Sequence, residues 1–236
     1  SVSSASTSTT DAPDSISRAA ADTPAMPPPM TTTSLLVMVR TLGRDYDRDM
    51  AVTDANPDSF RRMDESTAEQ WAHIGARTFE NQGRVADRMI MLLESLAEIS
   101  DGFITDQLTH CLQTATMAEK AGADEEMIFG ALMHDVGKAI SVPNHGAISA
   151  EMIKPYVRED VYKAILNHQD FQGKHYYDHF GAPTDLRYTK YDQNESWWAL
   201  CAEFTDDWDQ QAFDPDAETY PCLLYTSPSP RDNPAS

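Results

Sequence analysis

The segment Leu132-Met133-His134-Asp135-Val136-Gly137-Lys138 decides how the rest of this sequence is interpreted. Its apolar residues predict the end of a helix, and Gly137 is a typical stop signal. Adjacent residues on a helix point about 100° apart, so His134 and Asp135 share a ligand only where the helix end faces it. Such a pair most often binds a metal ion. The segment therefore predicts a helix end that faces a metal.

Further residues beside helix ends or on inward helix faces extend this pair. They are His110, His145, His168 and Asp209. Neutral imidazole and carboxylate groups suit Fe, Mn, Zn, Co or Ni. A histidine alone is more often an ordinary core or surface residue, so the ordered series carries the prediction. Six ligands exceed what one tetrahedral zinc ion takes, and the set therefore predicts two metal ions bridged by Asp135.

The spacing of apolar residues predicts one all-α domain over residues 58–221, because helical periodicity recurs and strand-like alternation is almost absent. Helices are expected over 64–82, 85–99, 106–120, 127–136, 144–154 and 196–211, and another opens at 158–160. The residues expected to cap helices are Asp64-Glu65-Ser66, Asp124, Asn144 and Asn194. The aromatic segment 171–192 is expected to be irregular.

Composition excludes several kinds of partner. The 236 residues include 18 Lys and Arg against 38 Asp and Glu, which gives a formal net charge of −20. Phosphate backbones and anionic membranes bind basic surfaces, so we expect a small-molecule substrate, with no nucleic acid and no membrane as partner. Cys111, Cys201 and Cys222 offer no disulfide framework, which favours a reducing, cytoplasmic location. Organellar targeting stays open because the sequence begins without Met.

The two ends of the sequence differ from its middle. Residues 1–57 begin with a stretch rich in Ser, Thr, Ala and Pro, which cannot bury enough apolar area to offset the entropy of ordering. We therefore expect a disordered, low-complexity N-terminal segment. Residues 222–236 resemble the translated read-through of a sequencing adapter, and we expect them to be a non-native tail.

The series His110, His134-Asp135 and Asp209 resembles the signature of the HD-domain superfamily of all-α metalloenzymes. His145 and His168 match the two added histidines of its dinuclear members. The run from His110 to Ala115 is similar to the H-x-x-Q-T-A motif of myo-inositol oxygenase and of the diiron oxygenase that cleaves 2-amino-1-hydroxyethylphosphonate. Residues 132–138 also fit the L-x-H-D-x-G-K motif of the inositol enzyme. The resemblance covers about 85–221 and implies an HD-type helical bundle.

The resemblance also bears on the last ligand. Asp206 and Asp209 lie three residues apart and would share one face of a regular helix. Trp208-Asp209 fits an aromatic-Asp pair of both oxygenase families, which favours Asp209. Phosphonate-cleaving members carry an Arg where this chain has Asp206, and a carboxylate there is expected to repel a dianionic substrate. The remaining histidines, which lack such context and are not expected to bind metal, are His73, His175 and His179.

Two reaction classes stay open. In the first, favoured by the H-x-x-Q-T-A run, a mixed-valent diiron oxygenase uses O2 to oxidise or cleave a small hydroxylated substrate, with Asp135 bridging the irons. In the second, two Mn, Ni, Co or Zn ions activate water in a phosphohydrolase that acts on a small phosphate ester or nucleotide. Lys138 is a candidate for a cationic catalytic group. The alternative interpretation is that its side chain is solvated and only stabilises the helix end. A non-enzymatic binding module is disfavoured because no ligand is missing.

Overall fold

The structure, a computed structural model, describes residues 59–220. The N-terminal segment 1–57 and the tail 222–236, for which disorder and a non-native origin are expected, lie outside these residues. Within them the chain forms helices and irregular segments without a β-strand, which confirms the all-α prediction. None of the helices in this part of the chain has the length and apolar character needed to cross a membrane.

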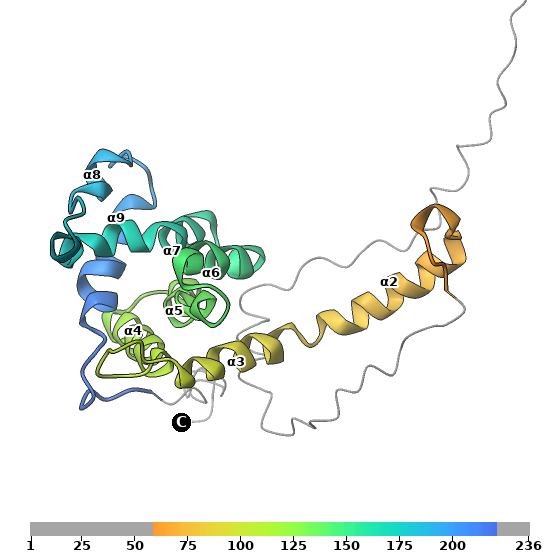
Figure 1. Cartoon of the computed structure of the whole chain (residues 1–236), viewed down its shortest axis with the longest axis horizontal. Coiled ribbons are helices and arrows are strands. Elements are labelled where there is room, and N and C mark those ends of the chain that lie inside the picture. The colour runs from red at the N-terminus through yellow and green to blue at the C-terminus, as the bar shows by residue number, and fades with distance from the viewer. Residues whose placement is uncertain (1–58, 221–236) are drawn as a thin grey trace, which may run out of the picture.

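Two consecutive helices lead into a helical body (Figure 1). The first, α2 (Ala68–Gln82), projects away from the body and has no buried residue. The second, α3 (Val85–Ser95), packs onto the body through Ala86, Met89 and Leu93. The body then continues as α4 (Gln107–Ala121), α5 (Glu125–Met133), α6 (His145–Ile153), α7 (Glu159–Gln172), α8 (Leu186–Thr189) and α9 (Trp198–Glu203).

Two apolar clusters hold the body together. The larger one joins α3, α4, α5, α6 and α7 through buried side chains such as Leu93, Cys111 and Ile165. The smaller one joins α7 to the chain around α9 and consists of Ala164, Phe171, Trp197 and Cys201. Burial of this apolar surface is the dominant force that brings the helices together, and it places their polar ends face to face.

The observed capping residues agree only in part with those predicted from the sequence. Asp106 and Asp124 cap α4 and α5 with their side chains, which confirms Asp124 as a cap. The cap of α2 is Thr67 rather than 64–66, because Thr67 and Gln70 form a reciprocal capping box. Asn144 is not a side-chain cap, since a 3-10 turn runs directly into α6 and supplies a backbone acceptor.

The last expected helix, over 196–211, is broken into three pieces. After α9 comes a π-helical turn, η8 (Phe204–Trp208), and then a 3-10 turn, η9 (Asp209–Gln211). Asn194 does not cap α9, because it lies in a turn and bonds to the carboxylate of Asp192. A π turn closes its hydrogen bonds over five residues instead of four, so it rotates the next residues relative to a regular helix. Asp206 and Asp209 therefore no longer share one face.

Candidate metal centre

Six buried side chains from separate parts of the chain converge inside the body. They are His110 on α4, His134 and Asp135 after α5, His145 at the start of α6, His168 on α7, and Asp209 after the π turn. None has more than 5% of its surface exposed. Their nitrogen and oxygen atoms form three overlapping groups, and the atoms of each group lie within 4.8 Å of one another. The fold thus brings together all six ligands proposed from the sequence.

Asp135 lies between two pairs of histidines. Its Oδ2 is 3.4 Å from His134 Nε2 and 3.5 Å from His110 Nε2. Its Oδ1 is 3.1 Å from His145 Nε2 and 3.6 Å from His168 Nε2. The two oxygens of one carboxylate therefore face different histidine pairs, which is the arrangement that a bridging ligand between two cations needs.

The four histidines share one pattern of hydrogen bonds. Each donates its Nδ1–H at 2.6–3.0 Å to a backbone carbonyl, the acceptors being Ala212, Ala131, Val142 and Ile165 for His110, His134, His145 and His168 in turn. A carbonyl oxygen only accepts, so the proton of a neutral ring sits on Nδ1 and leaves the Nε2 lone pair free. Metal-ligating histidines almost always use their other nitrogen in this way.

The free Nε2 atoms then face each other closely. Those of His110 and His134 are 3.1 Å apart, and those of His145 and His168 are 3.2 Å apart. Two lone pairs at this distance repel unless a cation is shared between them. The buried oxygens of Asp209 and Oδ1 of Asp135 also lack a hydrogen-bond donor. Unpaired buried carboxylates are costly, and metal coordination is one of the few ways to compensate them. The donor set therefore fits two metal ions.

The electrostatics of the cluster favour cations. Against the opposing effect of burial, the charges of His134 and Lys138 hold the pKa of Asp135 well below its usual range. Asp209 is likewise held in its ionised form, with its pKa lowered by His134 and His110 in spite of burial. In return, although burial works the other way, Asp135 and Asp209 raise the pKa of His134 to about 10, so that a proton on Nε2 takes the place of a cation as long as no metal is bound. The site holds two anions in a dry environment and attracts positive charge.

Two glycines let the histidines approach. A Cβ atom at Gly137 would overlap the backbone carbonyl oxygen of His145 and lie 2.8 Å from its Cα. The Gly137 N–H also donates to Ser149 Oγ at 2.9 Å. A Cβ atom at Gly146 would lie 3.2 Å from Cε1 of His168. Gly137, expected only to end a helix, therefore also allows α6 to bring His145 to Asp135.

The H-x-x-Q-T-A run forms hydrogen bonds with the segment 212–214, which follows Asp209. His110 Nδ1 donates to Ala212, and Gln113 Nε2 donates to the Asp214 carbonyl at 2.5 Å. Phe213, between these two acceptors, stacks on the His110 ring with centroids 4.3 Å apart. Phe103 in turn stacks on Phe213 at 4.9 Å. The run therefore covers one side of the cluster with aromatic rings, a role that the motif alone did not reveal.

Asp206 lies apart from the cluster. Its carboxylate pairs with Arg187, with His175 at 2.7 Å and with Lys174 at 3.2 Å. Against the effect of burial, these partners hold its pKa below the usual value, with Arg187 the strongest of them. Because three basic side chains compensate this charge, the expected repulsion of a dianionic substrate by Asp206 loses its basis. Sequence reasoning missed Arg187, which lies on α8 within the segment 171–192 that is expected to be irregular.

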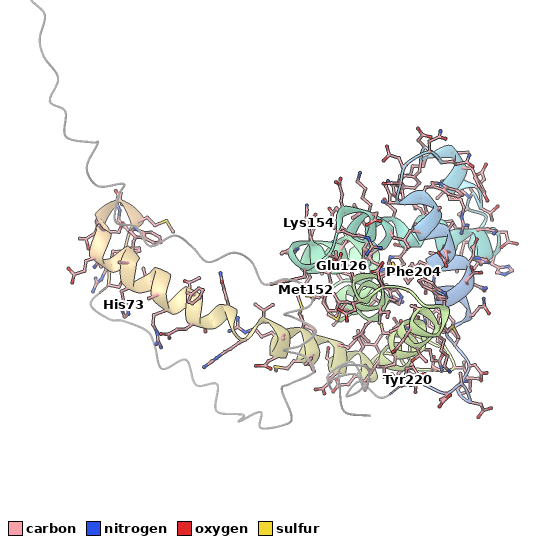
Figure 2. All side chains as sticks on the ribbon, turned by 180° about the vertical axis from the view of Figure 1, so that it is seen from behind. His73, Glu126, Met152, Lys154, Phe204 and Tyr220 are labelled. Carbon is pink, nitrogen blue, oxygen red and sulfur yellow. The ribbon has the colours of Figure 1, made fainter. Side chains whose placement is uncertain are left out.

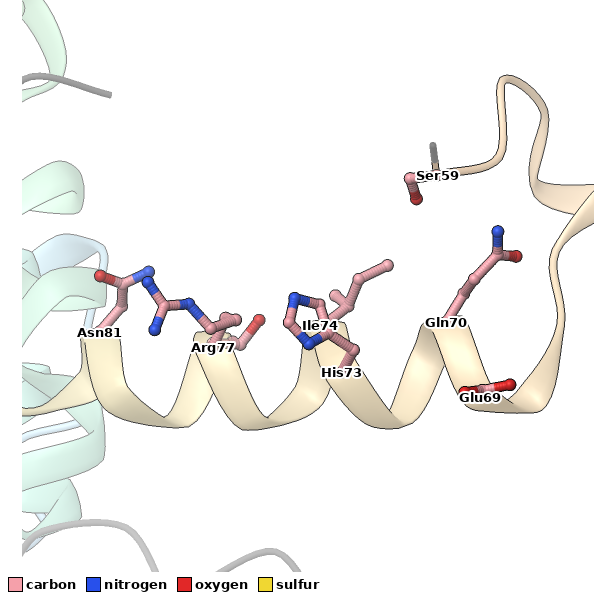
Figure 3. A pocket seen from close by; sticks show the side chains of 8 residues that line it. Ser59, Glu69, Gln70, His73, Ile74, Arg77 and Asn81 are labelled. Atoms are coloured by element: carbon pink, nitrogen blue, oxygen red, sulfur yellow. The ribbon is translucent and has the colours of Figure 1, made fainter. Parts of the chain in front are cut away.

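The histidines not expected to bind metal lie elsewhere. His175 pairs with Asp206, and the side chain of His179 is 74% exposed. His73 is on α2, far from Phe204 in the body (Figure 2). It lines a pocket of about 510 Å³ along α2, which Figure 3 shows with Ser59 opposite the helix face. None of the six converging residues lines this pocket.

The fold and the site define a helical body built around a buried His/Asp cluster. The family model of the HD domain matches residues 108–208 of this chain. The match begins two residues before His110 and ends one residue before Asp209, so it spans five of the six converging residues. No curated protein matches the chain. Residues 108–208 thus resemble an HD domain, and the buried His/Asp groups are compatible with a dinuclear metal site.

Proposed function

We propose that this chain is a dinuclear metal enzyme, and specifically a diiron oxygenase that oxidises or cleaves a small hydroxylated substrate with O2. The observation that carries the proposal is Asp135, whose two oxygens face the Nε2 atoms of two histidine pairs. HD domains are typically metal-dependent hydrolases or oxygenases. Of these two classes, the H-x-x-Q-T-A run over 110–115 supports the oxygenase.

Two iron ions held by the six residues would supply the O2 and one-electron chemistry that no side chain offers. The chain's own contribution begins with the ligands, whose orientation is fixed by the four Nδ1–H bonds. It continues with Phe103 and Phe213, whose stacked rings cover His110. Apolar cover keeps water away and strengthens the electrostatic interactions inside the site.

Lys138 is the cation nearest to Asp135. Its Nζ is 2.5 Å from Asp135 Oδ2 and 2.8 Å from Gln107 Oε1, and its side chain is 14% exposed, so it is not a solvated lysine. Although burial opposes this, Asp135 raises the pKa of Lys138, which stays charged. An ammonium only donates, so it fixes Oε1 of Gln107 and turns Nε2 away. That buried Nε2 has no partner and can donate to a substrate oxygen.

This pairing supports a hydroxylated substrate. One ammonium already engaged with Asp135 and one neutral amide suit a neutral or singly charged compound bound through its oxygens. The strongly acidic composition supports a small molecule rather than a nucleic acid or a membrane as partner. The three cysteines, which offer no disulfide framework, support the cytoplasm as the compartment. The phosphohydrolase stays the second candidate, because the compensated Asp206 no longer argues against an anionic phosphate ester.

Metal analysis combined with EPR, after purification without air, tests the proposal. We expect two iron ions per chain, the half-integer-spin signal of a mixed-valent pair after partial oxidation, and O2 consumption with a small polyol. Mn, Ni, Co or Zn together with turnover of p-nitrophenyl phosphate would instead establish the phosphohydrolase. Absence of any bound metal would contradict both.

A further inference from the structure

Arg187 has the largest fully buried side chain in the described part of the protein, with 1% of it exposed. It lies on the short helix α8, within the segment that the sequence marks as irregular. Burying a guanidinium is expensive unless its N–H groups are paired with good geometry. The partners of Arg187 compensate this cost at Nη1 and Nη2, whereas its buried Nε has no hydrogen-bond partner.

The guanidinium of Arg187 bonds to two other elements, α7 and η8, and the backbone of Arg187 is held by a third, α9. Its Nη1 donates to Asp206 Oδ2 at 2.8 Å and its Nη2 to Asp206 Oδ1 at 2.9 Å, a two-pronged pair that only Arg forms. Nη2 also donates to the backbone carbonyl of Phe171. The guanidinium lies 5.1 Å from the centre of the Phe171 ring. Trp198 Nε1 holds the Arg187 backbone by donating to its carbonyl at 2.9 Å.

The first of these elements, α7, carries His168, and the second, η8, leads directly into Asp209 at the start of η9. Phe171 comes three residues after His168 on α7, and Asp206 precedes Asp209 by three residues in the chain of the π turn. Phe204, in the same turn, has its ring 5.3 Å from His134 and 6.2 Å from His168. Arg187 therefore joins α7 to η8 directly behind the cluster, without contacting a converging residue itself.

We propose that Arg187 is a positioning residue that holds His168 and Asp209 in register for metal binding, through Phe171 and Asp206. This rests on the proposed metal centre. The π turn interrupts the four-residue hydrogen-bonding pattern of the preceding helix, and π turns are rare and short, so an external support would help to hold η8 in place. Groups that orient metal ligands from behind typically contribute about 10–100-fold to metal affinity. Arg187 acts on the ligands through Phe171 and Asp206, and we expect it to contribute the same factor of about 10–100 to metal affinity.

Titration of the full-length chain with Co²⁺, whose visible spectrum reports the geometry of its ligands, tests the role. Arg187→Lys keeps the charge but cannot form the two-pronged pair. Asp206→Asn keeps the shape but presents an NH2 group to Arg187. The matched control is Arg158→Lys. Arg158 pairs with Asp124 and joins the N-terminal ends of α5 and α7, whereas His134 and His168 lie toward their C-terminal ends. We expect about 10–100-fold weaker Co²⁺ binding and an altered spectrum in the first two variants, and wild-type behaviour in the control.

Each outcome decides a different point. Co²⁺ affinity and spectrum equal to the control in both variants would overturn the role of Arg187 and leave the metal centre intact. If Arg187→Lys fails to fold, Asp206→Asn decides alone, since that side chain is 26% exposed and tolerates a polar replacement better. A wild-type chain that binds no Co²⁺ would overturn the metal centre, and the role of Arg187 with it.

Discussion

Gly137 and His145 approach each other so closely that a single added carbon at Gly137 would overlap the His145 backbone. The α6 helix thus reaches Asp135 only because position 137 has no side chain. The close approach has a direct consequence for the metal that His145 and His168 would hold.

Substitution Gly137→Ala should move α6 away from Asp135 and cost about one metal equivalent per chain, since backbone cannot yield as a flexible side chain does. Elemental analysis of the purified variant measures this. The control is Gly75→Ala on α2, where no atom lies within 4 Å of the added carbon. In the control we expect two metal ions per chain and a free energy of unfolding that is higher by about 0.5–1 kcal/mol, because alanine is the better helix former. Two metals in Gly137→Ala would contradict the interpretation.

Substitution Asp135→Asn should remove both metals or nearly all activity. The carboxamide keeps the shape but no longer separates two cations with an anion. His110→Ala is the comparison, because His110 faces only Oδ2 of Asp135 and should affect one metal. We expect about one metal equivalent to stay bound in His110→Ala. Full occupancy in Asp135→Asn would refute the bridging role.

Substitution Lys138→Met should leave both metals bound and reduce turnover about 100-fold. The ammonium contacts Asp135 but is not a metal ligand, so its loss removes a substrate donor rather than a ligand. Metal content and O2 consumption, measured on the same preparation, separate the two effects. Loss of metal together with activity would show that Lys138 instead orients Asp135.

Asp206 should make stability depend on pH in the acid range. Its pKa in the folded state is lowered by Arg187, against burial, from the usual 3.8. The stabilisation is therefore present above the unfolded pKa and is lost as the pH falls through the folded pKa. Urea unfolding of metal-free protein should show Asp206→Asn about 2 kcal/mol less stable than wild type at pH 6. The difference should shrink steadily below pH 4. The neighbouring exposed Asp207→Asn, as control, should not reproduce it.

The sequence predicts most of the helices, because helices depend on local spacing, and it predicts the six converging residues from their ordered series of residue types. Asp106 and Asp124 cap helices through short-range hydrogen bonds, which depend only on residues close in the sequence. The π turn is different, since no periodic pattern distinguishes it from a regular helix. The pair of Arg187 and Asp206 joins positions 19 residues apart across an irregular segment, and only the packed fold brings them together.

The hydrogen bonds of the four histidines differ in how far along the chain they reach. His134, His145 and His168 each donate to a carbonyl three residues earlier in their own segment, so their tautomers are set as soon as those segments form. His110 differs, because its acceptor at Ala212 is 102 residues away. The tautomers of three imidazoles are thus set within their own segments, whereas that of His110 depends on the packing of the C-terminal part of the body against α4.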